Sequence, residues 1–145
     1  MAESQQIYFF LEEVSYNLKD KKKIREWIIK SAENEDYMIG SLNFIFTNDN
    51  VLLQLNKEYL RHFTLTDIIT FDLSEKEREL SGDIFISIDR AKENSREFND
   101  SLSDEVHRLI IHGVLHLMGY KDKSPEEKQV MRAKEEFYLS LPPWS

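Results

Sequence analysis

Cysteine is absent from this chain of 145 residues, and its absence narrows the chemistry that the protein can perform. Without a thiol there is no disulfide, no cysteine nucleophile and no thiolate metal site, so any metal ligands must be histidines and carboxylates. No apolar run approaches the roughly 20 residues that a membrane-spanning helix needs. The first six residues lack the basic and apolar stretches of a secretory signal. We therefore expect an intracellular, soluble protein that contacts no membrane.

Glycine and proline are also scarce, with four and three residues, and no repeat or low-complexity segment occurs. No flexible linker is evident, so residues 1–145 are expected to form a single domain with a substantial core. Acidic residues outnumber basic ones, which leaves a net charge of −8. A protein that coats nucleic acid usually carries a clear basic patch, so the overall charge disfavours that class.

Two local groups of basic residues stand out against this acidic balance. The first comprises the five lysines and arginines between residues 19 and 25, and we interpret it as a solvated helix end. The second is the pair Lys121 and Lys123, which flank Asp122 and are candidates for contacting a phosphate.

Hydrophobic periodicity predicts an alternation of strands and helices. Strands are expected at 7–14, 41–46, 67–71 and 83–88, and helices at 21–32, 50–59, 88–98, 104–118 and 125–139. This order, β-α-β-α-β-β-α-α-α, predicts an α+β domain with one mixed sheet of about four strands covered by helices. In the last helix Ser124 is the expected N-cap and Pro125 the first residue, with Met131 and Phe137 in the core. Trp144 is expected to pack back on the body.

The strongest functional signal is a pair of histidines four residues apart, His112 and His116, followed by Gly119 and Asp122. Residues i and i+4 of a helix share a face, so the two imidazoles can converge on one metal ion. Gly119 stands where a helix end favours a left-handed residue, and a turn there can bring Asp122 to the same ion. Three protein ligands with a fourth position open are typical of catalytic metal sites. The pattern predicts a metal-dependent hydrolase whose site lies on a helix and the following turn.

The other two histidines are not expected at this site. At about 100° per residue, His107 is turned well away from His112 and His116 on the same helix. We interpret His107 as a packing or surface residue, and His62 as a loop residue that has no partner by spacing.

Gly113 bears on which class of hydrolase this is. Zinc peptidases of this helical type carry glutamate directly after the first histidine, where it acts as general base. Glycine has no side chain, so a peptidase would need its base from elsewhere, which disfavours that class without eliminating it. The glycine would instead allow another backbone or a substrate to approach the helix closely.

Four segments resemble, in order and spacing, the motifs of one family, the YbeY family of metal-dependent endoribonucleases, which are rRNA maturation factors. They are His-Gly-Val-Leu-His-Leu-Met-Gly-Tyr at 112–120, Leu-Asn-Lys-Glu-Tyr at 55–59, Thr-Asp-Ile-Ile-Thr-Phe at 66–71 and Gly-Asp-Ile at 82–84. The resemblance extends over most of the chain, from residue 40 to residue 140 or so. The family fold is the same small α+β sheet domain.

The resemblance implies that His112, His116 and residue 122 bind one metal ion per chain, usually assigned as zinc. It also implies a single-strand-specific endoribonuclease that acts in 16S rRNA 3′-end maturation and ribosome quality control in the bacterial cytoplasm. Ribosomal RNA precursors would be its substrates, and a ribosomal subunit or assembly proteins its further partners.

Two positions depart from the family pattern. Most members have histidine as third ligand, whereas the carboxylate of Asp122 makes the site harder and leaves manganese and iron(II) open beside zinc. Members also usually have an arginine after the tyrosine of the Leu-Asn-x-x-Tyr segment, where this chain has Leu60, with Arg61 one place off. Arg61 therefore joins His112 and His116 as a candidate catalytic residue if a loop adjustment brings it to the substrate, and is otherwise an ordinary surface arginine.

The working hypothesis is metal-assisted hydrolysis of a phosphodiester, with Arg61, Lys121 or Lys123 holding the phosphate. Two alternatives stay open. One is a metallopeptidase-like hydrolase that uses the same ligands, and the other is a non-catalytic ribosome-assembly factor whose metal is structural. The sequence does not identify the general base.

Overall fold

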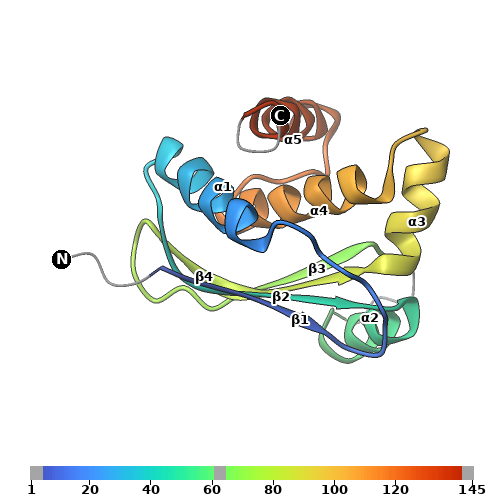
Figure 1. Ribbon diagram of the computed structural model, residues 1–145. Coiled ribbons are helices and arrows are strands. Elements are labelled where there is room, and N and C mark those ends of the chain that lie inside the picture. Colours follow the sequence, from blue (N-terminus) through green and yellow to red (C-terminus); the bar gives the residue numbers. More distant parts are fainter. Residues whose placement is uncertain (1–4, 61–64, 142–145) are drawn as a thin grey trace.

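The computed structural model describes residues 5–60 and 65–141 (Figure 1). Arg61, His62 and Trp144, for which the sequence raised expectations, lie outside these described residues. Among the described residues, no helix combines the length and the apolar character that crossing a bilayer requires.

Four strands form one mixed sheet in the order β1-β2-β4-β3. Their bounds are Gln6–Leu11 for β1, Met38–Thr47 for β2, Ile68–Asp72 for β3 and Glu79–Ser87 for β4. Strands β1, β2 and β4 run parallel, and β3 pairs antiparallel with β4. Alternate residues of the two central strands, such as Phe44 and Ile84, are fully buried, as the period of two along a strand requires. The predicted α+β domain with a four-stranded mixed sheet is confirmed.

Five α-helices complete the described part of the domain (Figure 1). They are α1 (Lys21–Asn34), α2 (Asp49–Leu55), α3 (Ile88–Glu97), α4 (Leu102–Leu117) and α5 (Pro125–Leu139), and a π-helical turn, η1 (Asn56–Leu60), continues α2. Figure 1 shows α1 and α4 against one face of the sheet and α5 on the outer side of α4, away from the sheet. Helix α4 thus lies between the sheet and α5.

Gly113 lets α4 lie against the sheet. A Cβ atom at this position would be 2.9 Å from Cγ2 of Ile84 and 3.1 Å from Cδ1 of Ile68, so a side chain here would require the helix or these isoleucines to shift. A backbone or a substrate was expected to approach this glycine closely, but the groups that do so are side chains of β3 and β4. The flank of α4 that carries His112 and His116 is left for other partners.

Helix α5 begins as predicted. Ser124 accepts a hydrogen bond from the backbone of Glu127, the two residues form a capping box, and Pro125 is the first helical residue. Met131 is buried as expected, but the expectation for Phe137 is wrong, because its side chain is 49% exposed. The fully buried residue is its neighbour Tyr138, which lies seven positions after Met131 and so shares its face, whereas Phe137 is turned about 100° off that face.

Candidate metal centre

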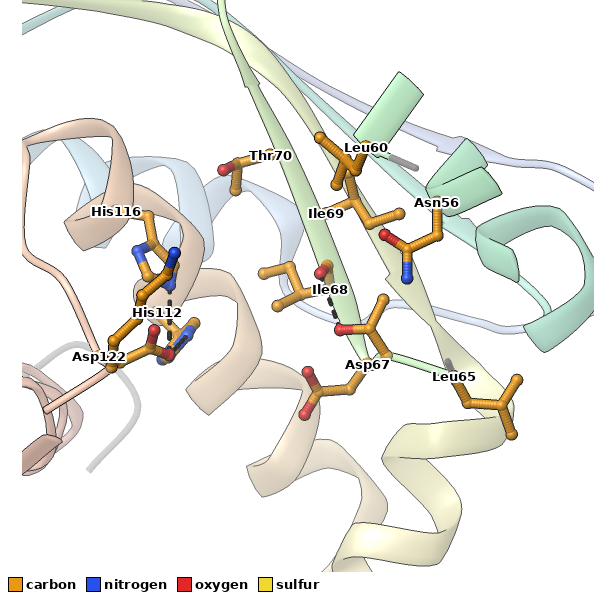
Figure 2. A pocket seen from close by; sticks show the side chains of 12 residues that line it. Asn56, Leu60, Leu65, Asp67, Ile68, Ile69, Thr70, His112, His116 and Asp122 are labelled. Atoms are coloured by element: carbon orange, nitrogen blue, oxygen red, sulfur yellow. Dashed lines mark hydrogen bonds and ion pairs between the residues drawn. The ribbon is translucent and has the colours of Figure 1, made fainter. Parts of the chain in front are cut away.

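A cleft of about 480 Å³ runs between α4 on one side and β3 with η1 on the other (Figure 2). Its lining residues are Asn56, Leu60, Leu65, Thr66, Asp67, Ile68, Ile69, Thr70, His112, His116, Asp122 and Lys123. Figure 2 shows His112, His116 and Asp122 gathered at one wall, with Asn56 and Leu60 facing them from the other. The predicted ligand group therefore borders a cleft that a substrate can enter.

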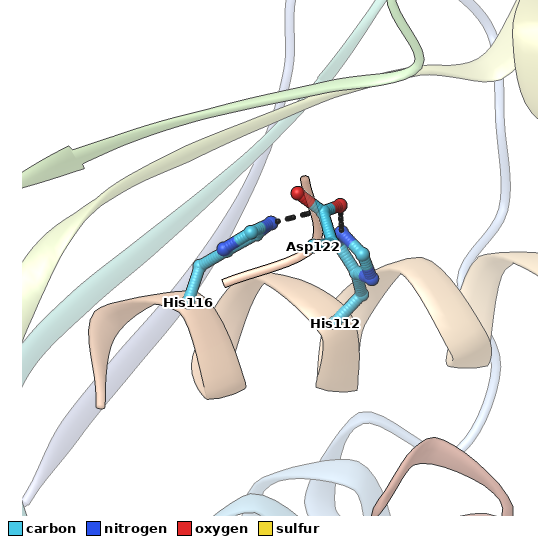
Figure 3. A group of neighbouring side chains, drawn as sticks. All are labelled: His112, His116 and Asp122. Atoms are coloured by element: carbon cyan, nitrogen blue, oxygen red, sulfur yellow. Dashed lines mark ion pairs between the residues drawn. The ribbon is translucent and has the colours of Figure 1, made fainter. Parts of the chain in front are cut away.

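Within this wall, His112 and His116 project from one face of α4, and Asp122 reaches back over both from the following segment (Figure 3). Oδ2 of Asp122 lies 3.2 Å from Nε2 of His112 and 3.5 Å from Nε2 of His116. Atoms that each lie 2.1 Å from one tetrahedral zinc ion are about 3.4 Å apart. The three side chains offer ligand atoms that all lie within 4.8 Å of one another, a spacing that fits a single ion. This group can bind a metal ion.

The turn that returns Asp122 to the helix depends on Gly119. Its φ of 106° lies in the left-handed region, as the sequence predicted for this helix end. Its N–H donates to the carbonyl of His116 at 2.9 Å, and the next N–H, of Tyr120, donates to the carbonyl of Leu115 at 3.1 Å. These two bonds close α4 and direct the chain back along it.

Hydrogen bonds at the far side of each ring orient the two histidines. Nδ1 of His112 lies 2.5 Å from a carboxylate oxygen of Glu135, and Nδ1 of His116 lies 2.9 Å from the backbone carbonyl of Tyr120. Since both partners accept, the Nδ1 of each ring is the donor, and Nε2 is the nitrogen that faces Asp122 and is placed to bind a metal ion. Burial lowers the pKa of His116, and the nearby His112 lowers it further, so this ring is neutral at pH 7. The donor set therefore has the chemistry that a metal ion requires.

Behind His112, Glu135 belongs to a buried ionic network. Arg108 Nη1 donates to Glu135 at 3.2 Å and Nη2 donates to Glu105 at 2.6 Å, and the two glutamates are only 4% and 1% exposed. Burial by itself would raise the pKa of Glu135, but the bond from His112 and the charges of His112 and Arg108 outweigh it and lower the pKa. Asn94 donates to both Glu105 and Asp67, so the network runs from the candidate ligand His112 to the opposite wall of the cleft.

A second network fixes the carbonyl that holds His116. The hydroxyl of Tyr120 donates to Glu35 at 2.7 Å, Lys134 donates to the same carboxylate at 2.9 Å, and the hydroxyl of Tyr138 also donates to it. Glu35 directly follows α1, and Lys134 and Tyr138 belong to α5. The turn after α4 is therefore tied to the end of α1, which is remote in sequence, and to α5, the helix that follows the turn.

The two lysines beside Asp122 have different places. Lys123 lines the cleft, whereas Lys121 lines a separate hollow with Gly119 and Glu126. Of the expected phosphate contacts, the structure thus places Lys123 at the site and Lys121 away from it. Leu60, which stands where the family has its arginine, also lines the cleft.

Neither His107 nor any basic residue at 19–25 lines the cleft. His107 was expected to be a packing or a surface residue, and it packs, because its ring lies 6.4 Å from that of Trp27. In the basic group at 19–25, Lys22 and Lys23 are exposed, as expected of a solvated helix end. Arg25 departs from this, because it donates to the carbonyl of Ile7 and its guanidinium lies 5.2 Å from the centre of the Phe9 ring.

Three residues around the site, Glu135, Arg108 and Asp67, were not predicted from the sequence. A signal for Glu135 was present: it lies between Met131 and Tyr138 at positions i, i+4 and i+7, so a charged residue occupies the buried stripe of a helix. A buried carboxylate is almost always paired with a cation or a hydrogen-bond donor, so this position indicates such a partner close by. Nothing in the local sequence names His112 or Arg108 as that partner.

Known proteins that are similar to this chain indicate one family. A family model described as endoribonuclease YbeY matches residues 6–141. A protein of that name from Cytophaga hutchinsonii is 50% identical over 135 residues, covering 93% of this chain and 94% of the relative. Another, from Amoebophilus asiaticus, is 41% identical over 133 residues, covering 92% and 90%. The solution structure of a protein from Thermotoga maritima matches with a TM-score of 0.64 at 26% identity, covering 92% of this chain and 87% of the other. The resemblance seen in the motifs is confirmed: this chain belongs to the YbeY endoribonuclease family.

Proposed function

We propose that this protein is a metal-dependent endoribonuclease, specific for single strands, that acts in 16S rRNA 3′-end maturation and ribosome quality control in the cytoplasm. Residues 1–145 form its single domain, ribosomal RNA precursors are its substrates, and a ribosomal subunit or assembly proteins are its further partners. The observation that carries the proposal is the group of His112, His116 and Asp122 in the wall of the cleft, in a chain whose relatives are named endoribonucleases.

His112, His116 and Asp122 would hold one ion, which we propose to be zinc. Such an ion, when bound, supplies Lewis acidity that activates water and polarises a phosphoryl oxygen. The spacing of the three ligand atoms and the free Nε2 positions fit this role. Because one ligand is a carboxylate, manganese and iron(II) are the alternatives to test beside zinc.

The remaining residues of the cleft divide into those that bind the backbone and those that bind the bases. Lys123 supplies a positive charge for a phosphate, and Arg61, which directly follows the cleft residue Leu60, is proposed to contact the phosphate at the point of cleavage. Leu60 and Leu65 are 43% and 50% exposed and offer apolar surface to unpaired bases. Bases in a duplex are stacked and unavailable for such contacts, which accounts for a preference for single strands.

Gly113 argues against the peptidase alternative. Its position faces Ile84 and Ile68 of the sheet, so a glutamate there would point into the core and away from the ligand group. Apart from the ligand Asp122, the carboxylate that lines the described part of the cleft is Asp67, which accepts a hydrogen bond from Asn94 and lies 4.0 Å from Arg108. Oδ2 of Asp67 is thus already engaged by side chains behind the cleft wall.

The test is to measure metal content and RNA cleavage on the same samples of the wild type and of His116→Ala. The substrates are a single-stranded RNA that spans the 3′ end of the 16S rRNA precursor, a duplex RNA and an unfolded protein. We expect about one zinc per chain in the wild type, cleavage of the single strand alone, and loss of both metal and cleavage in the variant. His107→Gln changes a histidine outside the group and should keep both.

Each contrary result points to a particular alternative. Metal lost with cleavage unchanged in His116→Ala would assign the nuclease to a contaminant. Chelator-sensitive cleavage of the protein substrate, with RNA untouched, would favour a peptidase. A metal whose removal unfolds the domain, with no turnover of any substrate, would favour the assembly factor.

A further inference from the structure

The ligand group borders a second hollow, on the side of α5. We call it the α4–α5 groove; it measures about 190 Å³ and is lined by Arg108, His112, Asp122, Lys128, Met131, Arg132 and Glu135. The groove and the cleft of Figure 2 share His112 and Asp122. A ligand that extends across these two residues therefore enters both hollows.

Helix α5 carries two exposed basic residues on the side of the groove. Lys128 and Arg132 are four residues apart, share a face, and both line the groove. The acidic residues Glu126 and Glu127 line the separate hollow beside Gly119 instead. In a chain with a net charge of −8, this helix still presents two cations beside the ligand group.

Both cations are available for a ligand. Lys128 and Arg132 are exposed, and neither forms an ion pair or a side-chain hydrogen bond with another described residue. The third cation of the groove, Arg108, is already engaged by Glu105 and Glu135.

The two carboxylates that line the groove are both held by other groups. Glu135 is 4% exposed and its two oxygens contact Arg108 and His112, and Oδ2 of Asp122 faces His112 and His116. The cations of the groove that are left for a ligand are therefore Lys128 and Arg132, and they stand next to the site proposed for cleavage.

We propose that Lys128 and Arg132 form a phosphate subsite for single-stranded RNA. This inference rests on the proposed nuclease function and adds the path of the substrate. Nucleotides on one side of the cleaved bond lie in the cleft. The backbone on the other side of that bond lies in the α4–α5 groove. The guanidinium of Arg132 matches a phosphate with two parallel N–H donors, and the ammonium of Lys128 adds a point charge.

The expected effect follows from counterion release. Each phosphate contact to a single strand contributes about −0.7 to the slope of log affinity against log salt, which is about a fivefold factor at 0.1 M salt. Removing two contacts in the double variant Lys128→Gln/Arg132→Gln should weaken binding about 25-fold at 0.1 M salt and reduce the slope by about 1.4. The kcat for a bound substrate should change little, because neither residue touches the ligand group.

The experiment measures kcat and KM for an unstructured oligouridine at several salt concentrations, and its binding by fluorescence anisotropy. The matched control is Lys22→Gln/Lys23→Gln, which removes the same charge from two exposed positions that line neither the cleft nor the groove. We expect a raised KM and a shallower salt slope in the groove variant alone, with the metal content of all three proteins equal.

Failure of the subsite and failure of the proposed function give different results. A wild type that binds metal but cleaves no RNA would refute the nuclease function itself. A wild type that cleaves, beside a groove variant with unchanged KM and salt slope, would refute the subsite alone. Equal losses in the groove variant and in the control would also refute it, because they would reflect overall charge.

Discussion

Replacing Glu135 by glutamine is expected to weaken metal binding without preventing it. Glutamine has nearly the same shape, and its Oε1 can still accept the Nδ1–H of His112, so the orientation of the ring is retained. The substitution removes the negative charge behind the imidazole. In the wild type this charge makes Nε2 of His112 a stronger donor to the metal. Arg108 also loses one of the two carboxylates that it contacts directly.

The contacts of Glu135 determine how much metal affinity Glu135→Gln is expected to lose. Removing a partner that orients a metal-binding histidine typically costs 10- to 100-fold in metal affinity. Because the hydrogen bond to His112 survives in Glu135→Gln, we expect the lower end, about tenfold, or about 1.4 kcal/mol. Metal-free protein should also lose about 1–3 kcal/mol of unfolding free energy, because the partly buried Arg108 is left less well paired.

The variant Glu105→Gln separates the loss of metal affinity from the loss of unfolding free energy. Glu105 is 1% exposed and also binds Arg108, but it makes no contact with His112. Its variant should lose a similar amount of unfolding free energy, measured by urea denaturation of metal-free protein, while its zinc affinity stays within about threefold of the wild type. Zinc affinity is measured by competition with a chelating dye. Equal zinc affinities of Glu135→Gln and the wild type, or equal losses in both variants, would refute the assigned role of Glu135.

Three further predictions concern the candidate metal ligand Asp122, the glycine Gly113 in α4, and the dependence of stability on pH through Glu35. Asp122→His should keep one metal per chain and increase the preference for zinc over manganese, whereas Asp122→Ala should lose the metal; a metal-binding alanine variant would exclude Asp122 as a ligand. Gly113→Glu should lower the melting temperature by about 10 °C or more and create no peptidase, because its side chain would enter the core at Ile84; a stable variant would contradict the packing of α4. Burial alone would raise the pKa of Glu35, but hydrogen bonds from Tyr138, Lys134 and Tyr120 lower it below 4.5 overall. Its contribution to stability is therefore complete above pH 4.5 and is lost as the pH falls through the folded-state value, so the difference in unfolding free energy between the wild type and Glu35→Gln should shrink on acidification. A difference that does not vary with pH would contradict this.

Much of the candidate site was predictable because its signals are local. His112 and His116 are one helical turn apart, and Gly119 sets a turn within three residues of Asp122, so short-range geometry suffices to bring the three together. The same holds for the N-cap at Ser124. Phe137 was misplaced because hydrophobicity alone does not say which of two adjacent aromatic residues of a helix faces the core.

The sequence by itself determined the order of the strands and helices, the metal-binding pattern and the family, since each depends on spacing along the chain. Only the tertiary structure decided that Glu135 holds His112, that Gly113 faces the sheet, and that α5 presents Lys128 and Arg132 beside the ligand group. These features depend on how α5 packs against α4 and how α4 packs against the sheet. Such packing results from the burial of many side chains at once, and no local spacing encodes which residues of two helices will meet.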